Sequence, residues 1–237
     1  VQGAPALKVL PELLRELLAA VPWKRAMRWA SYRDRFARPV LWLLALLDGE
    51  VVPVEFGGQK AGASTRGHRF LAPDPVPVRS IEDYLRVLAG AHVILDPAVR
   101  RKRIEKQLAE AAAAAGLRVR PDEALLDEVN WLVEEPVAIV GEFPERYLQI
   151  PEPVIVSAER GHQRYFALEK SDGRLANRFV AIAGTRVRDP DVVRRGNERV
   201  LCARLEDARF FLEEDRKVSL AARTEQLRGV VFQRQVG

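Results

Sequence analysis

R-Y-F-A-L-E-K-S-D-G-R-L-A-N-R-F-V-A-I-A, residues 164–183, carries the clearest fold signal in this chain of 237 residues. Two runs rich in apolar residues, 164–168 and 175–183, flank Asp172-Gly173, and this pattern predicts a β-hairpin. Three segments with helical spacing precede it, and another Asp-Gly pair, Asp48-Gly49, precedes those. Strands followed by helices and again by strands predict an α+β fold, with a mixed or antiparallel sheet of hairpins and flanking helices.

Caps and helix breakers set the limits of the helices expected around that hairpin. Apolar residues recur at helical spacing, and a proline, a glycine or an Asp-Pro pair stands near each boundary. In the last of these helices, Asn197 and Glu198 are expected to tie the helix to the preceding domain. Helices are therefore predicted over residues 11–20, 80–88, 97–116 and 121–134, and over a long final segment from Asp189.

Strands are expected on both sides of the central helices. V-L-W-L-L-A-L, residues 40–46, is almost entirely large and apolar, so it predicts a strand buried on both faces, paired with 51–56 through the Asp48-Gly49 turn. Further strands are predicted over 137–140 and 154–157. The domains expected are an N-terminal helix over 1–22, an α+β domain over 23–188, and a long helix with a linker over 189–237.

Composition restricts the function without choosing it. The formal net charge is +5 and the pI about 9.6, which suits a polyanionic partner but is also common in proteins that bind no nucleic acid. The sequence lacks the glycine-rich nucleotide fingerprints, and its three histidines and single cysteine, Cys202, show no zinc-ligand spacing. We expect no cofactor, no metal and no catalytic residue in this chain. The single cysteine favours a reducing compartment, and no apolar run approaches a membrane span.

T-R-G-H-R-F, residues 65–70, is a candidate anion site. Gly67 lets a backbone approach a ligand closely, and Arg66, His68 and Arg69 offer donors that match phosphate oxygens. The structural alternative is that the two arginines bond to carbonyls or acids within the domain and hold the loop.

Two further groups mix cations with aromatic residues. Lys24, Arg25 and Arg28 surround Trp29 in a pattern typical of nucleic-acid backbones and stacked bases, although a buried tryptophan with solvated charges is the alternative. His162 and Arg164 open the second hairpin, where strand alternation predicts that both lie on one face with Phe166. The alternative for His162 is a hydrogen bond to a buried carbonyl. The run 100–103, R-R-K-R, is interpreted as a solvated helix face, with phosphate contact as the alternative.

In their order and spacing, these segments resemble the β subunits of the bacterial heterotetrameric glycyl-tRNA synthetases. The resemblance runs from about Trp23 to the C-terminus, and the family chain is considerably longer. The chain departs from the family pattern at Leu41, Gly161 and Gly184, where relatives often carry His or Asn. The matching pieces are K-R-A-M-R-W at 24–29, F-A-R-P-V-L-W at 36–42, L-L-D-G-E-V-V-P-V at 46–54, T-R-G-H-R-F-L-A-P at 65–73, L-L-D-E-V at 125–129, H-Q-R-Y-F at 162–166, and G-N-E-R-V-L at 196–201.

The resemblance implies a cytoplasmic segment of glycine–tRNA ligase whose partners are tRNA-Gly and a separate α subunit, without a membrane. Glycine activation with ATP and Mg²⁺ is expected on that α subunit, in a heterotetramer. The segment is expected to be similar to the editing-type domain of the phenylalanyl-tRNA synthetase β chain, and to stop before an HD-type domain. Its role would be tRNA binding and architecture, with an editing hydrolase acting on mischarged tRNA or a pure subunit interface as alternatives. The tRNA-binding candidates are Lys24, Arg25, Arg28, Arg66, His68, Arg69, His162 and Arg164, the last two lining a groove for a tRNA end.

Overall fold

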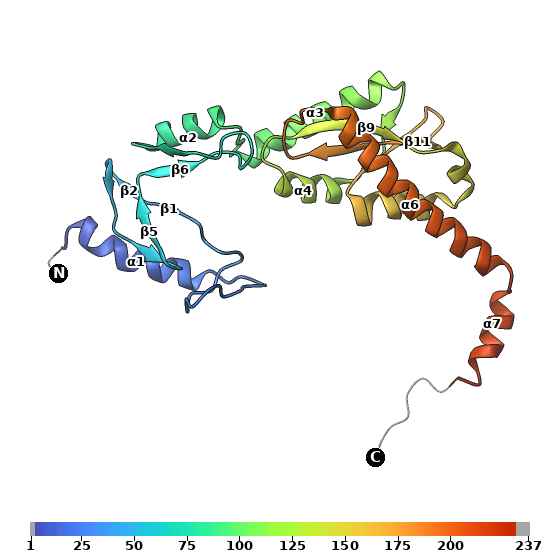
Figure 1. Ribbon diagram of the computed structural model, residues 1–237, viewed down its shortest axis with the longest axis horizontal. Helices are drawn as coiled ribbons and strands as arrows, with labels where there is room; N and C mark the ends of the chain where they lie inside the picture. The colour runs from blue at the N-terminus through green and yellow to red at the C-terminus, as the bar shows by residue number, and fades with distance from the viewer. Residues whose placement is uncertain (1–2, 231–237) are drawn as a thin grey trace, which may run out of the picture. The chain divides into compact units, whose positions relative to one another are not determined.

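The computed structural model describes residues 3–230, and its backbone contacts divide the chain into two compact units (Figure 1). Unit 1 ends at Asp96 and unit 2 begins at Pro97. Both combine helices with small sheets, so the α+β class is confirmed. The expected domain boundaries at residues 22 and 188 stay a prediction.

Unit 1 joins two helices to short strands. Val52, Val54 and Phe56 are buried and form its core with Val78 and Leu88. The strands form a three-stranded sheet, in the order β1-β5-β4, and two pairs, β2-β3 and β6-β7. Its elements are α1 (Ala6–Ala20), β1 (Leu43–Leu44), β2 (Leu46–Leu47), β3 (Glu50–Val51), β4 (Glu55–Phe56), β5 (Gln59–Gly62), β6 (Ser64–Arg66), β7 (Pro75–Pro77) and α2 (Ile81–Gly90).

Two predictions for unit 1 need correction. The strand over 40–46 is not buried on both faces, because Leu41 is 71% exposed and Trp42 43% exposed, and the run splits into β1 and β2. This small unit fills its core from 52–56 instead. The first helix begins at Ala6 and contains Pro11 in its interior. Pro11 cannot donate a backbone hydrogen bond, but apolar residues at helical spacing continue on both sides of it. The Asp48-Gly49 turn is confirmed, since both residues have positive φ, 51° and 87°, as a type I′ turn requires.

Unit 2 is built on a four-stranded antiparallel sheet in the order β8-β10-β11-β9, and α6 lies across β9 (Figure 1). The elements are α3 (Pro97–Ala114), β8 (Arg118–Val119), α4 (Glu123–Leu132), β9 (Val137–Glu142), η1 (Glu145–Gln149), α5 (Glu152–Ser157), η2 (Ala158–Gln163), β10 (Phe166–Glu169), β11 (Leu175–Ala183), α6 (Pro190–Arg216) and α7 (Leu220–Leu227).

Alternation along the central hairpin divides the core of unit 2 into two layers. Phe166 and Val180 pack with Ile104 of α3 and with α4, while Phe179 packs with Leu201 and other residues of α6. The sheet is therefore covered by helices on both faces. The β10–β11 hairpin predicted around Asp172-Gly173 is confirmed, and so are the three central helices and the final helix, with side-chain caps at Ser80, Asp122 and Asp189.

The segment before this hairpin is helical where strands were predicted. Residues 154–157 belong to α5, because Pro151 and Pro153 flank the start of a helix, a position that suits proline. His162 lies in the π-helical turn η2, and Arg164 adopts a left-handed conformation with φ 57°. The expected alternation of His162 and Arg164 with Phe166 is therefore wrong. Across the described residues, no helix is both long and apolar enough to cross a membrane.

Candidate nucleic-acid interface

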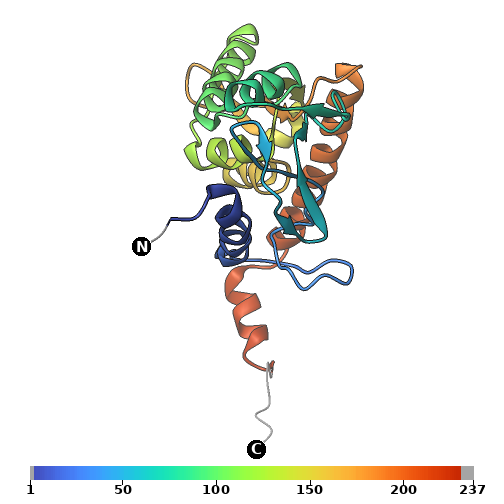
Figure 2. The same cartoon turned by 90° about the vertical axis from the view of Figure 1, so that its left-hand side faces the viewer.

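A basic hairpin, residues 23–38, projects as a loop from the body of unit 1 (Figure 2). Met27 and Phe36 exchange backbone hydrogen bonds of 2.9 and 3.2 Å that close its base. The Phe36 ring packs edge-on against Trp23, with ring centroids 4.7 Å apart, and against Phe56 of the core at 5.9 Å. The hairpin is thus anchored through its aromatic side chains.

Two glycines in the β4–β5 turn receive the other aromatic rings of the hairpin. A Cβ atom at Gly57 would lie 2.3 Å from the Trp29 indole, and one at Gly58 would lie 2.1 Å from the Tyr32 ring. Both glycines also have positive φ. Trp29 packs on this turn but is half-buried, so the alternative of a tryptophan buried in the core is met only in part, and base stacking by Trp29 stays a prediction.

The charges of the basic hairpin are unusually one-sided. It carries six cations and one acid, Asp34, a local surplus equal to the formal net charge of +5 of the whole chain. All six cations are exposed, and among residues 3–230 none of them forms an ion pair. Such a surface attracts a polyanion, because its single carboxylate, Asp34, leaves a surplus of five positive charges. The six are Lys24, Arg25, Arg28, Arg33, Arg35 and Arg38.

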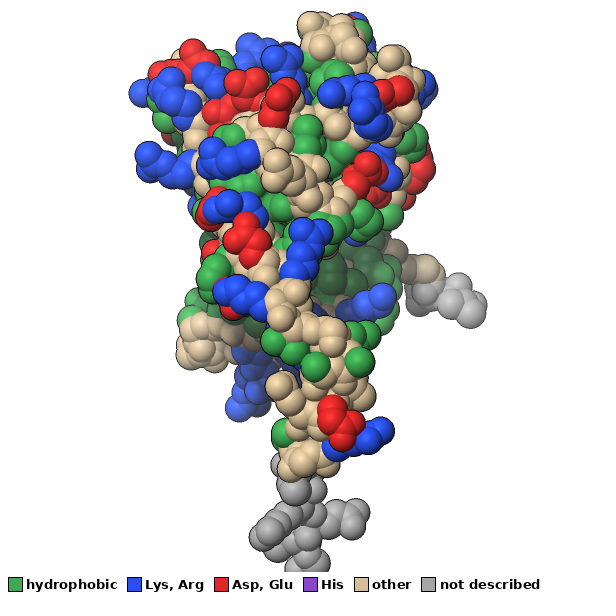
Figure 3. All heavy atoms as spheres, turned by 90° about the vertical axis from the view of Figure 1, so that its right-hand side faces the viewer, with side chains coloured by type: hydrophobic (Ala, Val, Ile, Leu, Met, Phe, Trp, Pro, Cys, Tyr) green, Lys and Arg blue, Asp and Glu red, His purple; other side chains and the backbone are tan. Residues whose placement is uncertain are grey.

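Arginines of unit 2 are arranged differently. Arg164 pairs with Glu128 at 2.7 Å, and Arg101 bonds to Glu105 and two further carboxylates. Arg194 pairs with Glu198 at 2.9 Å, and Glu198 also accepts a hydrogen bond from the Glu142 backbone, so its expected structural role is confirmed. Figure 3 shows cationic and acidic side chains intermixed on the face that it presents. The exposed arginine Arg164 therefore offers a largely compensated charge.

The histidine turn, residues 65–73, is held together by its own side chains. His68 is only 4% exposed, and its Nδ1 accepts hydrogen bonds from the backbone N–H groups of Phe70 and Leu71, at 3.3 and 3.4 Å. A guanidinium nitrogen of Arg66 donates to the carbonyl of Pro73 at 2.5 Å. Arg66 and His68 thus shape the turn, whereas no such hydrogen bond ties Arg69 to it within the described residues. The roles of Arg66, His68 and Arg69 in tRNA binding stay a prediction.

Gly67 meets protein rather than open space. A Cβ atom there would lie 2.4 Å from the Cβ of Ala91 and 2.6 Å from its carbonyl oxygen. The backbone N–H of His68 donates to that same carbonyl at 2.9 Å. The close approach that Gly67 permits is therefore to the end of α2.

His162 and Arg164 lie at the surface where η2 ends. Arg164, with Gln163 and Asn197, lines a groove of about 320 Å³ between α4, β11 and α6, whereas His162 does not line it. The structure therefore does not bring His162 and Arg164 into one groove, and the tRNA-binding role of each stays a prediction.

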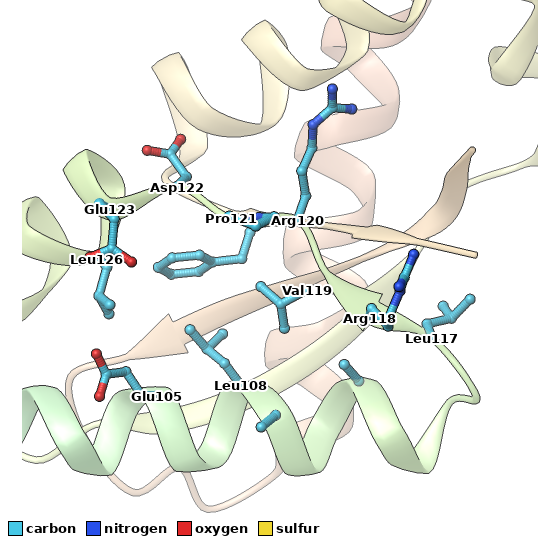
Figure 4. A pocket seen from close by; sticks show the side chains of 13 residues that line it. Glu105, Leu108, Leu117, Arg118, Val119, Arg120, Pro121, Asp122, Glu123 and Leu126 are labelled. Atoms are coloured by element: carbon cyan, nitrogen blue, oxygen red, sulfur yellow. The ribbon is translucent and has the colours of Figure 1, made fainter. Parts of the chain in front are cut away.

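A second groove of unit 2, of about 370 Å³, lies between α3, β8 and the start of α4 (Figure 4). Leu108, Leu126 and Phe166 form its apolar lining. Glu105 and Glu123 at its rim are both held by Arg101, so neither carboxylate is poised as a general base.

Glu159 is a buried carboxyl that sequence reasoning missed. Its side chain is fully buried in η2, and within the described chain neither carboxylate oxygen has a hydrogen-bond partner. Burial raises the pKa of Glu159 to about 8, against the opposing charge of Arg120. The group is therefore mainly protonated at neutral pH.

The structure adds Arg33, Arg35 and Arg38 to the cations expected from the sequence. A signal was present, because the interleaving of cations and aromatics continues beyond Trp29 as far as Arg38. No comparable signal marks Glu159, since its burial depends on how η2 packs.

Comparison with known proteins gives one consistent result. The family model described as glycyl-tRNA synthetase beta subunit matches residues 1–237. Proteins named glycine–tRNA ligase beta subunit are 47% identical in Syntrophotalea carbinolica and 49% identical in Anaeromyxobacter dehalogenans, each over 100% of this chain. The relative of the same name in Trichlorobacter lovleyi is 46% identical over 99% of the chain. The chain spans 34% of the length of each of these relatives.

Proposed function

Because the chain belongs to the family of glycyl-tRNA synthetase β subunits, we propose that this segment binds tRNA-Gly and supports its charging with glycine. In this proposal the segment makes no covalent bond itself. A separate α subunit binds ATP and Mg²⁺ and attaches glycine to the tRNA, in a cytoplasmic heterotetramer. The segment supplies contacts and architecture.

One observation carries the proposal: the six exposed cations of the basic hairpin have no acidic partner among the described residues. Phosphate oxygens of RNA are the acceptors that forked guanidinium donors match. Binding releases counterions from the RNA, so affinity from such contacts depends strongly on salt.

The mechanism is positioning. Phosphate contacts fix the register and orientation of a nucleic acid without reading its sequence. The hairpin suits this task because its rings are anchored on Gly57, Gly58 and Phe56, so the cations project from a supported loop. The hairpin would hold the tRNA backbone while the acceptor end of the tRNA reaches the α subunit.

Charging kinetics of the full-length ligase test this function. Replacing Arg25, Arg28 and Arg33 together by alanine is expected to raise the KM for tRNA-Gly roughly tenfold to hundredfold, because three solvent-exposed ion contacts of about 0.5–1 kcal/mol each are lost. The KM values for glycine and ATP are expected to stay unchanged, because the proposal places those ligands on the α subunit.

A matched control removes three cations that are already paired. Arg86, Lys106 and Arg174 are exposed and lie beside Asp83, Glu110 and Asp172. Their triple alanine variant loses the same formal charge as the hairpin variant. An equal rise in the KM for tRNA in both variants would show that total charge matters and would refute a role for the hairpin.

We also propose that unit 2 shares the architecture of the editing-type domain of the phenylalanyl-tRNA synthetase β chain. Its four-stranded antiparallel sheet between two helical layers supports this likeness. An experimental structure of the full-length protein, superposed on that domain, tests it. A different strand order would contradict it.

A further inference from the structure

Phe70 is a largely exposed aromatic residue of the histidine turn. Its side chain is 73% exposed, and the guanidinium carbon of Arg69 lies 5.5 Å from the centre of its ring. The His68 ring lies on the inner side, with ring centroids 6.0 Å apart. One aromatic ring is thus presented to solvent beside a cation.

Several independent contacts fix the backbone of the turn from which this ring projects. Nδ1 of the buried His68 accepts from the backbone N–H of Phe70 itself, and the His68 carbonyl accepts from Ala72 at 2.8 Å. Arg66 closes the turn on Pro73, and Gly67 packs against Ala91. Because the backbone of the turn is already constrained, a ligand that covers the ring orders little of the main chain.

We propose that the ring of Phe70 stacks on an unpaired base of the bound RNA, with Arg69 contacting the adjoining phosphate. This inference rests on the proposed function, which supplies the RNA. Exposed aromatic side chains stack on splayed bases, and arginine contributes both to the π-face and to the backbone. Any base satisfies such a contact, because each base has a π-face.

The surroundings of Phe70 favour a nucleobase over a protein partner. A stable protein interface needs an apolar core of several residues, with about 800 Å² buried on each side. The guanidinium of Arg69 lies against this ring. Apart from Phe70, Leu71 is the other large apolar residue exposed on this turn, and it is only 36% exposed. One exposed ring beside a cation matches an aromatic base joined to a phosphate.

Three substitutions at Phe70 in the full-length ligase test the inference through tRNA-Gly binding at several salt concentrations. Phe70→Ala and Phe70→Leu are expected to weaken binding roughly 5- to 100-fold, because leucine keeps apolar area but offers no π-face. Phe70→Tyr is expected to bind within about twofold of wild type. Because no charge is lost, the slope of log Kd against log salt is expected to remain at the wild-type value.

Other outcomes would overturn the stacking site. Equal affinity in all four proteins would show that Phe70 does not contact the RNA. If leucine retained the affinity that alanine loses, the contact would be apolar rather than stacked. If Phe70→Ala instead dissociated the α and β subunits in sedimentation, while tRNA affinity of the assembled ligase was unchanged, the ring would belong to a protein interface.

The proposed function and the stacking site fail separately. If the Arg25, Arg28 and Arg33 variant bound tRNA weakly and the Phe70 variants bound it normally, the stacking site would be refuted and the role of the hairpin supported. If the hairpin variant bound tRNA normally and the Phe70→Ala variant bound it weakly, the role of the hairpin would be refuted and the stacking site supported. Thermal unfolding of each Phe70 variant is expected to match wild type, since the side chain is largely exposed.

Discussion

A carboxylate oxygen of Asp34 accepts a hydrogen bond of 2.9 Å from the backbone N–H of Gly57. Asp34 is the only acid of the basic hairpin, and this bond directs it to the β4–β5 turn. Gly57 is buried, so its N–H depends on that acceptor. The acid therefore fastens the hairpin, while the cations around it keep their charge for a ligand.

Loss of this bond is expected to open the hairpin. Asp34→Ala leaves a buried N–H without its acceptor, at a cost of about 1–3 kcal/mol. Trypsin cleaves after lysine and arginine, so cleavage within residues 24–38 should become faster, as measured by timed proteolysis and mass spectrometry. Asp34→Asn keeps an acceptor oxygen and should resist cleavage more strongly. Equal cleavage of all three proteins would show that the bond does not hold the hairpin.

Gly67 is expected to be intolerant of even one added methyl group. Gly67→Ala places a Cβ 2.4 Å from that of Ala91, so the turn must shift away from α2, at about 1–3 kcal/mol. Gly62→Ala is the matched control, since nothing lies within 4 Å of a Cβ there. The unfolding temperature of unit 1 should fall for Gly67→Ala and not for Gly62→Ala. A similar decrease in both variants would mean that the contact with Ala91 is not the cause.

The buried carboxyl of Glu159 predicts a loss of stability as pH rises. Its folded-state pKa of about 8 lies above the ordinary value of 4.5, so the folded state keeps a proton that the unfolded chain releases between these values. Unit 2 should lose about 1.4 kcal/mol per pH unit across that interval. Glu159→Gln cannot ionise, and it should therefore be more stable than wild type at pH 8 and nearly equal to it at pH 4.5.

Hydrogen exchange of the Phe179 and Val180 amides measures this difference, because both residues are fully buried in the central strand β11. Comparing wild type with Glu159→Gln at each pH cancels the intrinsic exchange rate. A stability difference that does not change between pH 5 and pH 8 would contradict the raised pKa.

Local chemistry explains which parts of the fold could be predicted from the sequence. Ser80, Asp122 and Asp189 cap their helices through bonds to backbone N–H groups two or three residues away, so the signal and the structure lie in one segment. The burial of residues 40–46 and the helix over 154–157 depended on distant partners or on competing signals. An apolar run alone does not tell a buried strand from an exposed one.

The candidate site shows the same limit. Arg28 and Arg164 both stand beside aromatic residues in the sequence, so the pattern favours both. Only the structure shows that Glu128 pairs with Arg164, while Arg28 has no acid beside it in the described chain. Likewise, the sequence marks the motif around His68, but only the structure separates the residues that shape the turn from those that face solvent.

The salt dependence of tRNA-Gly binding by the full-length protein tests the role of the basic hairpin most directly. Each phosphate contact removed should lower the slope of log Kd against log salt by about 0.7–0.9. We therefore expect the Arg25, Arg28 and Arg33 triple alanine variant to lose roughly 2 to 3 from this slope, and the Arg86, Lys106 and Arg174 variant to keep the wild-type slope. A hairpin variant with the wild-type slope, or an equal loss in the control, would contradict the account.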